Sequence, residues 1–239
     1  MATTRHVPKT ALWAIHTLTA SGAFIAFLAF LAVERGDYRL ALLWLAAGLV
    51  VDGADGPLAR WTGLAERMPA IDGATLDLVV DYLTYVFVPA VLIYRDGLLP
   101  AGWGGVGVAA ILLSSLYTFA RTDMKTPDNF FRGFPAVWNV IAFYLFLWRP
   151  DPMVGAGVVA LFTVLTFAPI HFIHPVRVQS YRPWLSILMP VWGVTSLALL
   201  WPGVPFAGVL MDVSLGCALA LFGIGLLRTL RGPGVIEAS

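Results

Sequence analysis

Long apolar runs alternate with short polar connections along this chain. A helix needs about 20 apolar residues to cross the hydrocarbon core of a bilayer. Eight segments approach or reach that length if the second apolar run continues into the acidic stretch that follows it. They cover residues 11–33, 40–59, 73–94, 99–120, 133–148, 153–174, 183–201 and 206–227. The pattern predicts an all-α polytopic membrane bundle of about eight transmembrane helices, organised as a single integral membrane domain over residues 1–239.

Composition supports this interpretation. Hydrophobic residues make up 59% of the chain and charged residues 12%, against roughly 25% charged residues in an average soluble domain. The mean hydropathy is +0.82. A net charge of +1 gives no basis for nucleic-acid binding. Because Cys217 is the only cysteine, the chain cannot form an internal disulfide or a cysteine metal cluster.

Lysine and arginine are distributed unevenly between the predicted loops, and their excess marks the cytoplasmic side. Four of the 15 lie on the side opposite the N-terminus: Arg35, Arg39, Arg95 and Arg149. The other 11 are Arg5, Lys9, Arg60, Arg67, Arg121, Lys125, Arg132, Arg177, Arg182, Arg228 and Arg231. Both termini are therefore predicted to be cytoplasmic. The first apolar run is too long for the core of a signal peptide, so we interpret it as a retained span.

Two pairs of aspartates lie where the second and third predicted helices meet their shared loop: Asp52 with Asp55, and Asp77 with Asp81. Spacings of three and four residues place both members of a pair on one helix face. Because the two helices are antiparallel neighbours, the four carboxylates are expected to converge at the cytoplasmic face. Such groups repel one another unless a cation neutralises them. Oxygen ligands suit Mg²⁺ or Mn²⁺, and two such ions would form a clamp for phosphoryl transfer.

Small residues accompany the first acidic pair. Gly53, Gly56 and Ala59 follow one another at three-residue intervals, and Arg60 comes next. A strip without bulk lets a ligand approach the backbone closely, and an arginine beside it can pair with a phosphate. The alternative is that the acids are solvated at a helix end and the small residues serve helix packing.

The whole pattern, D-G-A-D-G-P-L-A-R at 52–60 followed by G-A-T-L-D-L-V-V-D at 73–81, resembles the hallmark of the CDP-alcohol phosphotransferases. Members of this family join an alcohol to the phosphate of a CDP-linked lipid and release CMP. Twelve residues separate Arg60 from Gly73, a longer gap than in most members and similar to that of the bacterial phosphatidylcholine synthase branch. Residues 16–23, 75–90 and 119–139 also resemble that branch, so the resemblance covers most of the chain.

The resemblance implies roles for individual residues. Asp52, Asp55 and Asp77 would be ligands of two divalent ions, Mn²⁺ or Mg²⁺. Asp81 would take the proton of the alcohol while also touching a metal. The residues expected to contact CDP-diacylglycerol are Thr19, Gly56, Ala59, Arg60, Gly73 and Arg121. His16 occupies a position where the family usually has asparagine, which leaves a nucleotide contact and a packing role both open.

Choline, the acceptor that the branch implies, carries a quaternary ammonium group without an N–H donor, so aromatic faces are expected to bind it. The candidates for this pocket are Tyr82, Tyr85, Tyr117, Trp138 and Asn139. Aromatic residues are also ordinary at a membrane interface, which is the competing interpretation. In the loop after the fourth span, Arg121, Lys125 and Arg132 are candidates for holding a phosphate, or they belong to the general excess of positive charge on the inner face.

The resemblance thus implies transfer of the phosphatidyl group of CDP-diacylglycerol to choline at the cytoplasmic face of a bacterial inner membrane. Family members are often dimers, so a homodimer is the expected assembly. One alternative is a family member that uses serine or glycerol phosphate, although phosphorylated alcohols demand several converging basic residues and the motif offers only Arg60 and Arg67. Another is a divalent-cation transporter, which would place its acids near the membrane centre with repeat symmetry.

Overall fold

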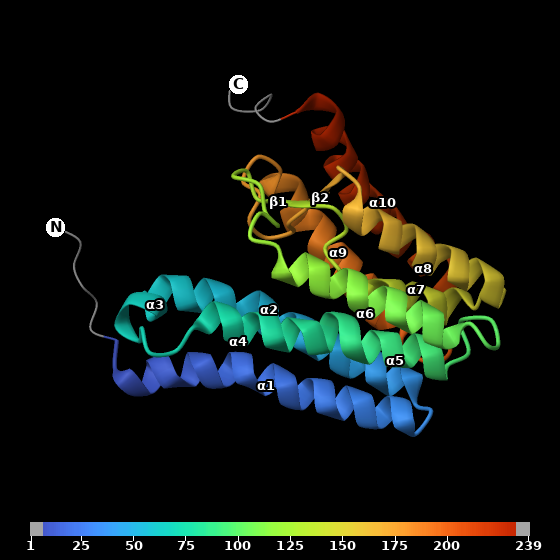
Figure 1. The fold of residues 1–239 in the computed structure, drawn as a ribbon, viewed down its shortest axis with the longest axis horizontal. Coiled ribbons are helices and arrows are strands. Elements are labelled where there is room, and N and C mark those ends of the chain that lie inside the picture. The colour runs from blue at the N-terminus through green and yellow to red at the C-terminus, as the bar shows by residue number, and fades with distance from the viewer. Residues whose placement is uncertain (1–6, 233–239) are drawn as a thin grey trace.

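The computed structural model describes residues 7–232, and nearly all of its regular structure is helical. The elements in chain order are α1 (Lys9–Glu34), α2 (Tyr38–Thr62), α3 (Leu64–Arg67), α4 (Gly73–Asp81), the π-helical segment η1 (Tyr82–Phe87), α5 (Val88–Arg95), α6 (Gly104–Ala120), β1 (Phe130–Arg132), α7 (Trp138–Trp148), α8 (Pro152–Phe167), β2 (His171–Ile173), α9 (Arg182–Leu199) and α10 (Ala207–Arg231). Figure 1 shows α1, α2 and the continuous α4–η1–α5 rod running along the length of the molecule, with α6 to α10 stacked against one side.

Each of the eight predicted segments contains a helix. Four helices are long and apolar enough to cross a membrane: Lys9–Glu34, Tyr38–Thr62, Gly73–Arg95 and Ala207–Arg231. The second of these continues through the acidic motif, as predicted. Helices α6, α7 and α8 are apolar but shorter. The 11 residues of α7 extend about 17 Å at 1.5 Å per residue, which is less than the hydrocarbon core of about 30 Å.

The prediction of one helix over residues 153–174 is wrong at its end, and so is the prediction of one over 133–148 at its beginning. Helix α8 ends at Phe167, and α7 begins only at Trp138. Pro169 follows the end of α8 and lacks the amide hydrogen that would continue the helix. Instead, the Gly133 amide donates to the Ile170 carbonyl over 2.7 Å, and the freed segments pair as strands.

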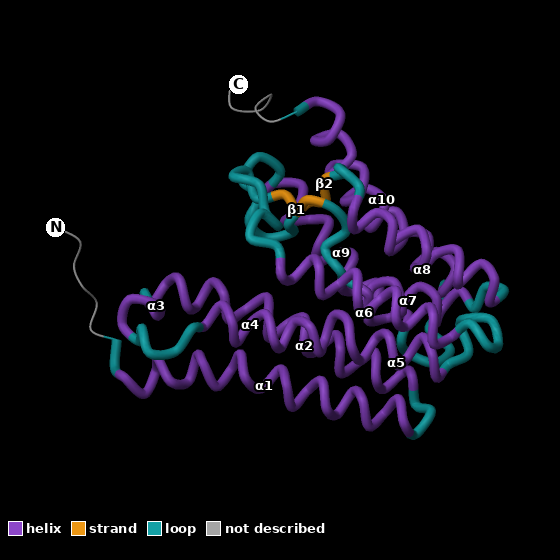
Figure 2. The backbone as a smooth tube through the Cα atoms, viewed as in Figure 1, coloured by secondary structure: helices purple, strands orange, loops and turns teal. Residues whose placement is uncertain are grey.

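A small antiparallel sheet is therefore the main departure from the all-α prediction (Figure 2). Strands β1 and β2 pair with Phe131 opposite Phe172, and Lys125 forms a further antiparallel bridge to Phe131 on the other side. A turn joins Lys125 to strand β1. In this turn the Asn129 amide donates to the Thr126 carbonyl over 2.9 Å, and Asn129 has φ 64°. A turn followed by a left-handed residue is a common hairpin connection. We call residues 124–132 and 171–174 the ribbon.

Local signals in the sequence fix the ends of the two helices that carry the acidic motif. The Asp37 side chain accepts the Leu40 amide at the start of α2, and the Asp72 side chain accepts the Ala74 and Thr75 amides at the start of α4. Such caps satisfy amides that the first helical turn leaves free. Gly63 ends α2 in the left-handed conformation, with φ 62°. The chain therefore turns back sharply between the two acidic pairs.

Packing inside the bundle relies on small residues and on hydrogen bonds between helices, as expected where lipid provides no hydrophobic driving force. Ala29 and Ala41 are completely buried, where α1 packs on α2. The Tyr144 hydroxyl accepts from the Trp192 indole and lies 2.9 Å from the Ser214 hydroxyl, which links α7, α9 and α10. Large apolar side chains remain exposed around the outside, which fits a surface that faces lipid.

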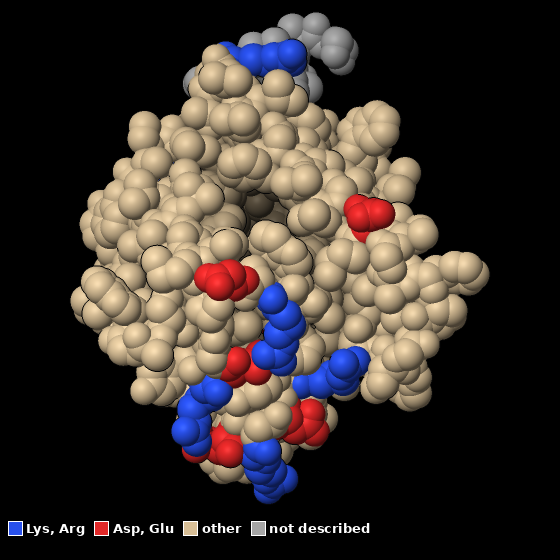
Figure 3. All heavy atoms as spheres, turned by 90° about the vertical axis from the view of Figure 1, so that its right-hand side faces the viewer, with Lys and Arg blue, Asp and Glu red and all other residues tan. Residues whose placement is uncertain are grey.

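The end of the bundle that carries the α1–α2, α5–α6 and α7–α8 loops contains acidic and basic side chains next to one another (Figure 3). Arg95 forms a two-point contact with Glu34, at 3.1 and 2.9 Å, and Arg149 bonds Asp96 over 2.7 Å. Glu34 and Asp96 at this end are thus each matched by an arginine of the chain itself. We call it the paired end.

Candidate active site

Three acidic side chains from two helices converge at the opposite end of the bundle. Asp52 and Asp55 on α2 and Asp77 on α4 each offer a carboxylate oxygen, and these oxygens all lie within 4.8 Å of one another. Asp55 is 5% exposed. Asp81 lies one helical turn beyond Asp77 on α4, and one of its oxygens is buried without a hydrogen-bond partner in the described part of the chain. We call these four residues the acidic cluster.

The packing of α4 on α1 and the turn at Gly63 bring the two pairs together. A Cβ built at Gly22 of α1 would lie 2.5 Å from a methyl carbon of Val80, so α4 lies very close to α1 at this point. Tyr85 in η1 then donates its hydroxyl hydrogen to Asp52 over 2.7 Å. This bond fixes one carboxylate of α2 against the α4–η1–α5 rod.

The acidic cluster has the chemistry of a site for divalent cations. None of the ion pairs within residues 7–232 involves its four carboxylates. Partly buried carboxylates at such short separations repel one another strongly without a compensating charge. Oxygen-only ligand sets suit Mg²⁺ and Mn²⁺. The donor set and the unpartnered oxygen of Asp81 therefore fit a divalent metal.

Basic side chains surround the acidic cluster without forming ion pairs with it. Lys125 and Arg177 both interact electrostatically with Asp52 and Asp77. Burial, together with the nearby Arg177 guanidinium, lowers the pKa of Lys125 below its ordinary value, although the carboxylates act in the opposite direction. Arg60 bends back along α2, so that its Nη1 would lie 3.2 Å from a Cβ at Gly56. A negatively charged ligand at the acidic cluster would meet these cations.

His174 belongs to the same basic surroundings. Burial and the charges of Lys125, Arg177 and Arg60 lower the pKa of His174 to about 3, so its ring is neutral at pH 7. It stacks on Phe131 with ring centroids 5.2 Å apart and an angle of 9°. Neither His174 nor Arg177 was among the residues predicted for the site. The basic segment directly after the sixth apolar run was the available signal for Arg177.

The residues predicted to border the nucleotide are distributed along α1, α2 and α4. Gly73 begins α4 beside His16, whose Cε1 would lie 3.5 Å from a Cβ at Gly73. The Nε2 of His16 is buried and has no partner among the described residues. Thr19 is buried one turn further along α1, while Ala59 lies on the last turns of α2. His16 thus packs against the start of α4, and its free nitrogen leaves a polar contact open.

Arg121 is engaged elsewhere. Its guanidinium makes two hydrogen bonds of 2.9 Å to Asp123 and lies over the Tyr117 ring, 5.6 Å from the centroid. Lys125, from the same loop, is the one that the structure brings near the acidic cluster.

The side chains predicted for choline have separate surroundings. Tyr85 is bonded to Asp52. Tyr82 donates its hydroxyl to the Leu112 carbonyl over 3.2 Å, and Trp138 is fully buried with its indole donating to Ser115. Asn139 lines an apolar cavity of about 210 Å³ between α2, α7 and α9. In the described structure, Tyr85 is therefore the member of this set that contacts the acidic cluster.

Comparisons with known proteins relate the chain to one family. Residues 14–174 match the sequence profile of the CDP-alcohol phosphatidyltransferase family. The chain is 40% identical over 225 residues to a phosphatidylcholine synthase of Pseudomonas aeruginosa, which covers 94% of each protein. It is 47% identical over 195 residues to one of Bradyrhizobium diazoefficiens, covering 81% of this chain and 72% of that protein. A phosphatidylcholine synthase of Legionella pneumophila is 38% identical over 197 residues, covering 80% and 77% respectively.

Proposed function

The chain belongs to the CDP-alcohol phosphatidyltransferase family, and from this premise we propose that it transfers the phosphatidyl group of CDP-diacylglycerol to choline, giving phosphatidylcholine and CMP. Membership of this family makes the chain a phosphatidyltransferase. The alternative of a divalent-cation transporter, which the four aspartates alone also allowed, is therefore excluded. The choice of choline over serine or glycerol phosphate rests on the relatives, which are named phosphatidylcholine synthases. The observation that carries the chemistry is the convergence of three carboxylates within 4.8 Å, none in an ion pair within the described residues.

In this proposal Asp52, Asp55 and Asp77 hold divalent metal, Mn²⁺ or Mg²⁺, with Asp81 completing a site for two ions. When bound, the metal supplies positive charge opposite the diphosphate and the departing CMP. Tyr85 orients Asp52 by donating a hydrogen bond to one of its oxygens. The hydrogen bond keeps the ligand oxygens of α2 from rotating away, which is the usual role of a group behind a metal ligand.

Asp81 is the proposed general base. The choline hydroxyl oxygen attacks the phosphorus of the phosphatidyl group while its proton passes to Asp81. The bond between that phosphorus and the bridging oxygen breaks, and CMP leaves with the bonding electrons. Support comes from the buried oxygen of Asp81, which has no hydrogen-bond donor among residues 7–232 and is therefore free to accept a proton.

The cations around the acidic cluster are proposed to bind the diphosphate of CDP-diacylglycerol. Lys125 and Arg177 approach the carboxylates from the ribbon side, and Arg60 lies along α2 over Gly56. Each can donate a charge-assisted hydrogen bond to a phosphate oxygen. Gly56, Ala59 and Gly73 leave room for the nucleotide next to the backbone, with Thr19 and His16 on the α1 side.

An apolar path for the lipid substrate lies beside the acidic cluster. On α2 the wall of the 210 Å³ cavity includes Leu49, which precedes Asp52 by three residues and so lies on the same helix face. Its other walls are apolar residues of α7 and α9, such as Phe143 and Leu197. We propose that this cavity receives part of an acyl chain of CDP-diacylglycerol while the headgroup occupies the polar site.

The same proposal covers the membrane arrangement. All eight apolar helices cross a bacterial inner membrane, both termini are cytoplasmic and the acidic cluster faces the cytoplasm. The uneven distribution of lysine and arginine supports this orientation, as does the mixture of matched charges at the paired end. The shorter helices α6, α7 and α8 would span by locally thinning the bilayer. A homodimer is the expected assembly.

In the decisive experiment, the purified full-length protein is incubated in detergent with CDP-diacylglycerol and with choline, serine or glycerol phosphate in turn. We expect CMP release that depends on choline and on Mn²⁺ or Mg²⁺, with phosphatidylcholine as the lipid product. Release of CMP without choline, or a preference for serine or glycerol phosphate, would overturn the choice of acceptor.

A further inference from the structure

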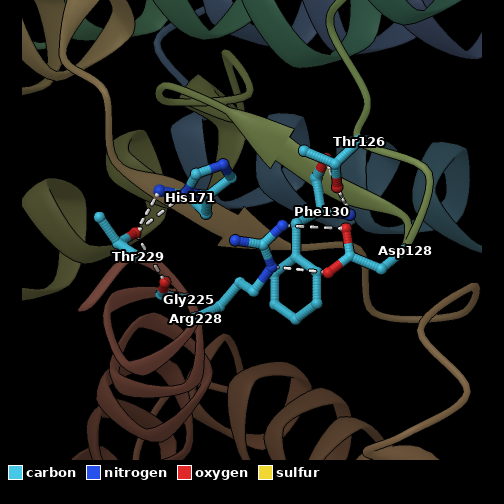
Figure 4. Close-up of polar contacts among 7 residues, drawn as sticks. All are labelled: Thr126, Asp128, Phe130, His171, Gly225, Arg228 and Thr229. Atoms are coloured by element: carbon cyan, nitrogen blue, oxygen red, sulfur yellow. Dashed lines mark hydrogen bonds and ion pairs between the residues drawn. The ribbon is translucent and has the colours of Figure 1, made fainter. Parts of the chain in front are cut away.

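The ribbon is joined to the end of α10 by polar contacts (Figure 4). Arg228 donates from Nε to one Asp128 oxygen over 2.6 Å, and from Nη2 to the other over 3.3 Å. The arginine side chain is only 11% exposed, and it lies over the Phe130 ring. The last turns of α10 therefore bind the turn of the hairpin through the ion pair between Arg228 and Asp128.

A second contact on the same turn of α10 reaches the other strand. The His171 amide donates to the Thr229 hydroxyl oxygen over 2.7 Å, and the Thr229 hydroxyl donates to the Gly225 carbonyl over 2.9 Å. A Cβ at Gly225 would lie 2.2 Å from the His171 carbonyl oxygen. Only glycine lets the helix and strand β2 approach this closely. We call Asp128, Arg228, Thr229 and Gly225 the clasp.

The ribbon also carries Lys125, a cation that interacts electrostatically with the acidic cluster. Lys125 bridges to Phe131 in the backbone, and its ammonium lies 5.3 Å from the centroid of that ring, while His174 stacks against the same ring. Lys125 in turn interacts electrostatically with Asp52, Asp77 and Asp81. Only two residues separate Lys125 from Asp128. Asp128 of the clasp and Lys125, the proposed diphosphate contact, therefore lie at the two ends of one short turn.

We propose that the clasp positions Lys125 for the diphosphate of CDP-diacylglycerol, so that Asp128, Arg228 and Thr229 are positioning residues for the transfer reaction. This inference rests on the proposed function. The α10 part of the clasp lies outside residues 14–174, which match the family profile. Without the clasp, the turn over residues 126–129 keeps its own hydrogen bonds but loses its anchor, and the lysine samples positions away from the substrate.

The test compares Arg228→Gln, Asp128→Asn and the isosteric Thr229→Val with the wild-type enzyme. Steady-state measurements give separate KM values for CDP-diacylglycerol and choline. We expect KM for CDP-diacylglycerol to rise by about tenfold, the size typical of a lost charge-assisted contact, while KM for choline stays within about twofold of wild type. Lys125→Ala should cause the same rise, and the Lys125→Ala/Arg228→Gln double variant should be no worse than Lys125→Ala alone.

Arg231→Gln is the matched control, because it removes the same charge from an exposed position on the last turn of α10. Unchanged KM in the clasp variants, equal changes for both substrates, or additive effects with Lys125→Ala would overturn the proposal.

Amide hydrogen exchange provides a readout that does not depend on turnover. In folded Arg228→Gln and Thr229→Val, exchange at residues 124–132 should be faster than in wild type, with α1 unchanged. Unaltered exchange in the ribbon would overturn the clasp. If wild type made no phosphatidylcholine, the proposed function would fail, and the exchange result would still decide whether α10 holds the ribbon.

Discussion

Buried carboxylates occur at both ends of this bundle, and the two ends neutralise them differently. At the paired end the Asp96 side chain is 4% exposed and bonded to Arg149, and Glu34 is bonded to Arg95. In the acidic cluster Asp55 is also buried, yet none of the four carboxylates forms an ion pair within the described residues. Burying a charge without a partner is costly. The chain itself therefore supplies a cation for the buried carboxylate of the paired end, although Oδ2 of Asp96 has no hydrogen-bond partner among the described residues, whereas the acidic cluster has no cation of its own and requires a ligand.

Replacing one acid at each end should separate these roles most clearly. In Asp55→Asn and Asp81→Asn we expect turnover to fall by about 10³-fold or more, because a metal ligand or the base is lost. Folding should be preserved, since each change removes one of several mutually repelling charges. Asp96→Asn should retain turnover and lose about 1–2 kcal/mol of stability, since Arg149 is half exposed. CMP release and thermal unfolding in detergent measure both quantities. Near-wild-type turnover in Asp81→Asn would remove its assignment as the base.

Removal of the metal should affect the acidic cluster and leave the paired end unchanged. Chelation is expected to abolish CMP release, and adding back Mn²⁺ or Mg²⁺ at about 100 times its Kd should stabilise the wild-type protein by about 2.7 kcal/mol. Asp55→Asn should show a much smaller stabilisation, whereas Asp96→Asn should respond like wild type. Differential scanning fluorimetry with and without metal makes the comparison. An equal response in Asp55→Asn would place the ion elsewhere.

One glycine at each end of the bundle allows the packing of the two ends to be compared. A Cβ at Gly155 would lie 2.1 Å from the Leu98 carbonyl oxygen, so Gly155→Ala should destabilise the paired end by about 1–3 kcal/mol without changing either KM. A Cβ at Gly56 would meet only the flexible tip of Arg60, at 3.2 Å. Gly56→Ala should therefore fold normally but bind CDP-diacylglycerol more weakly. Thermal unfolding and substrate titration distinguish the two outcomes, and a shared loss of stability would contradict the contrast.

The last comparison is a pH slope. The pKa of His174 is lowered to about 3 by burial and by the surrounding cations, whereas an unfolded histidine titrates near 6.5. The unfolded state therefore binds the extra proton first, and stability should decrease as the pH falls from about 6.5 toward 3. His174→Phe preserves a ring against Phe131 and should flatten this decrease. Thermal unfolding midpoints across that interval provide the measurement, and parallel curves would contradict it.

Much of this organisation was predictable because hydrophobic runs and helix spacing are local signals. The helices at all eight segments, the continuation of α2 through the acidic motif and the approach of Asp52, Asp55 and Asp77 follow from such spacing. The ribbon was not predicted, because its pairing joins residues about 40 positions apart. Its turn residues, T-P-D-N at 126–129, did carry a hairpin signal. The contributions of Arg177 and His174 depend on that pairing and were missed with it.

The π-helical segment that follows Asp81 sets how α4 and α5 are rotated relative to one another about their common axis. Each residue of an α-helix advances the chain by about 100° around the axis, and a π-turn accommodates an extra residue. Helix α4 can thus direct Asp77 toward α2 while α5 buries Leu92 and Ile93 in the core. If the residues of η1 wound as a regular α-helix without the loss of a residue, one half would be rotated against the other by about 100°. Either the carboxylates would turn away from Asp52, or the core face of α5 would turn toward lipid.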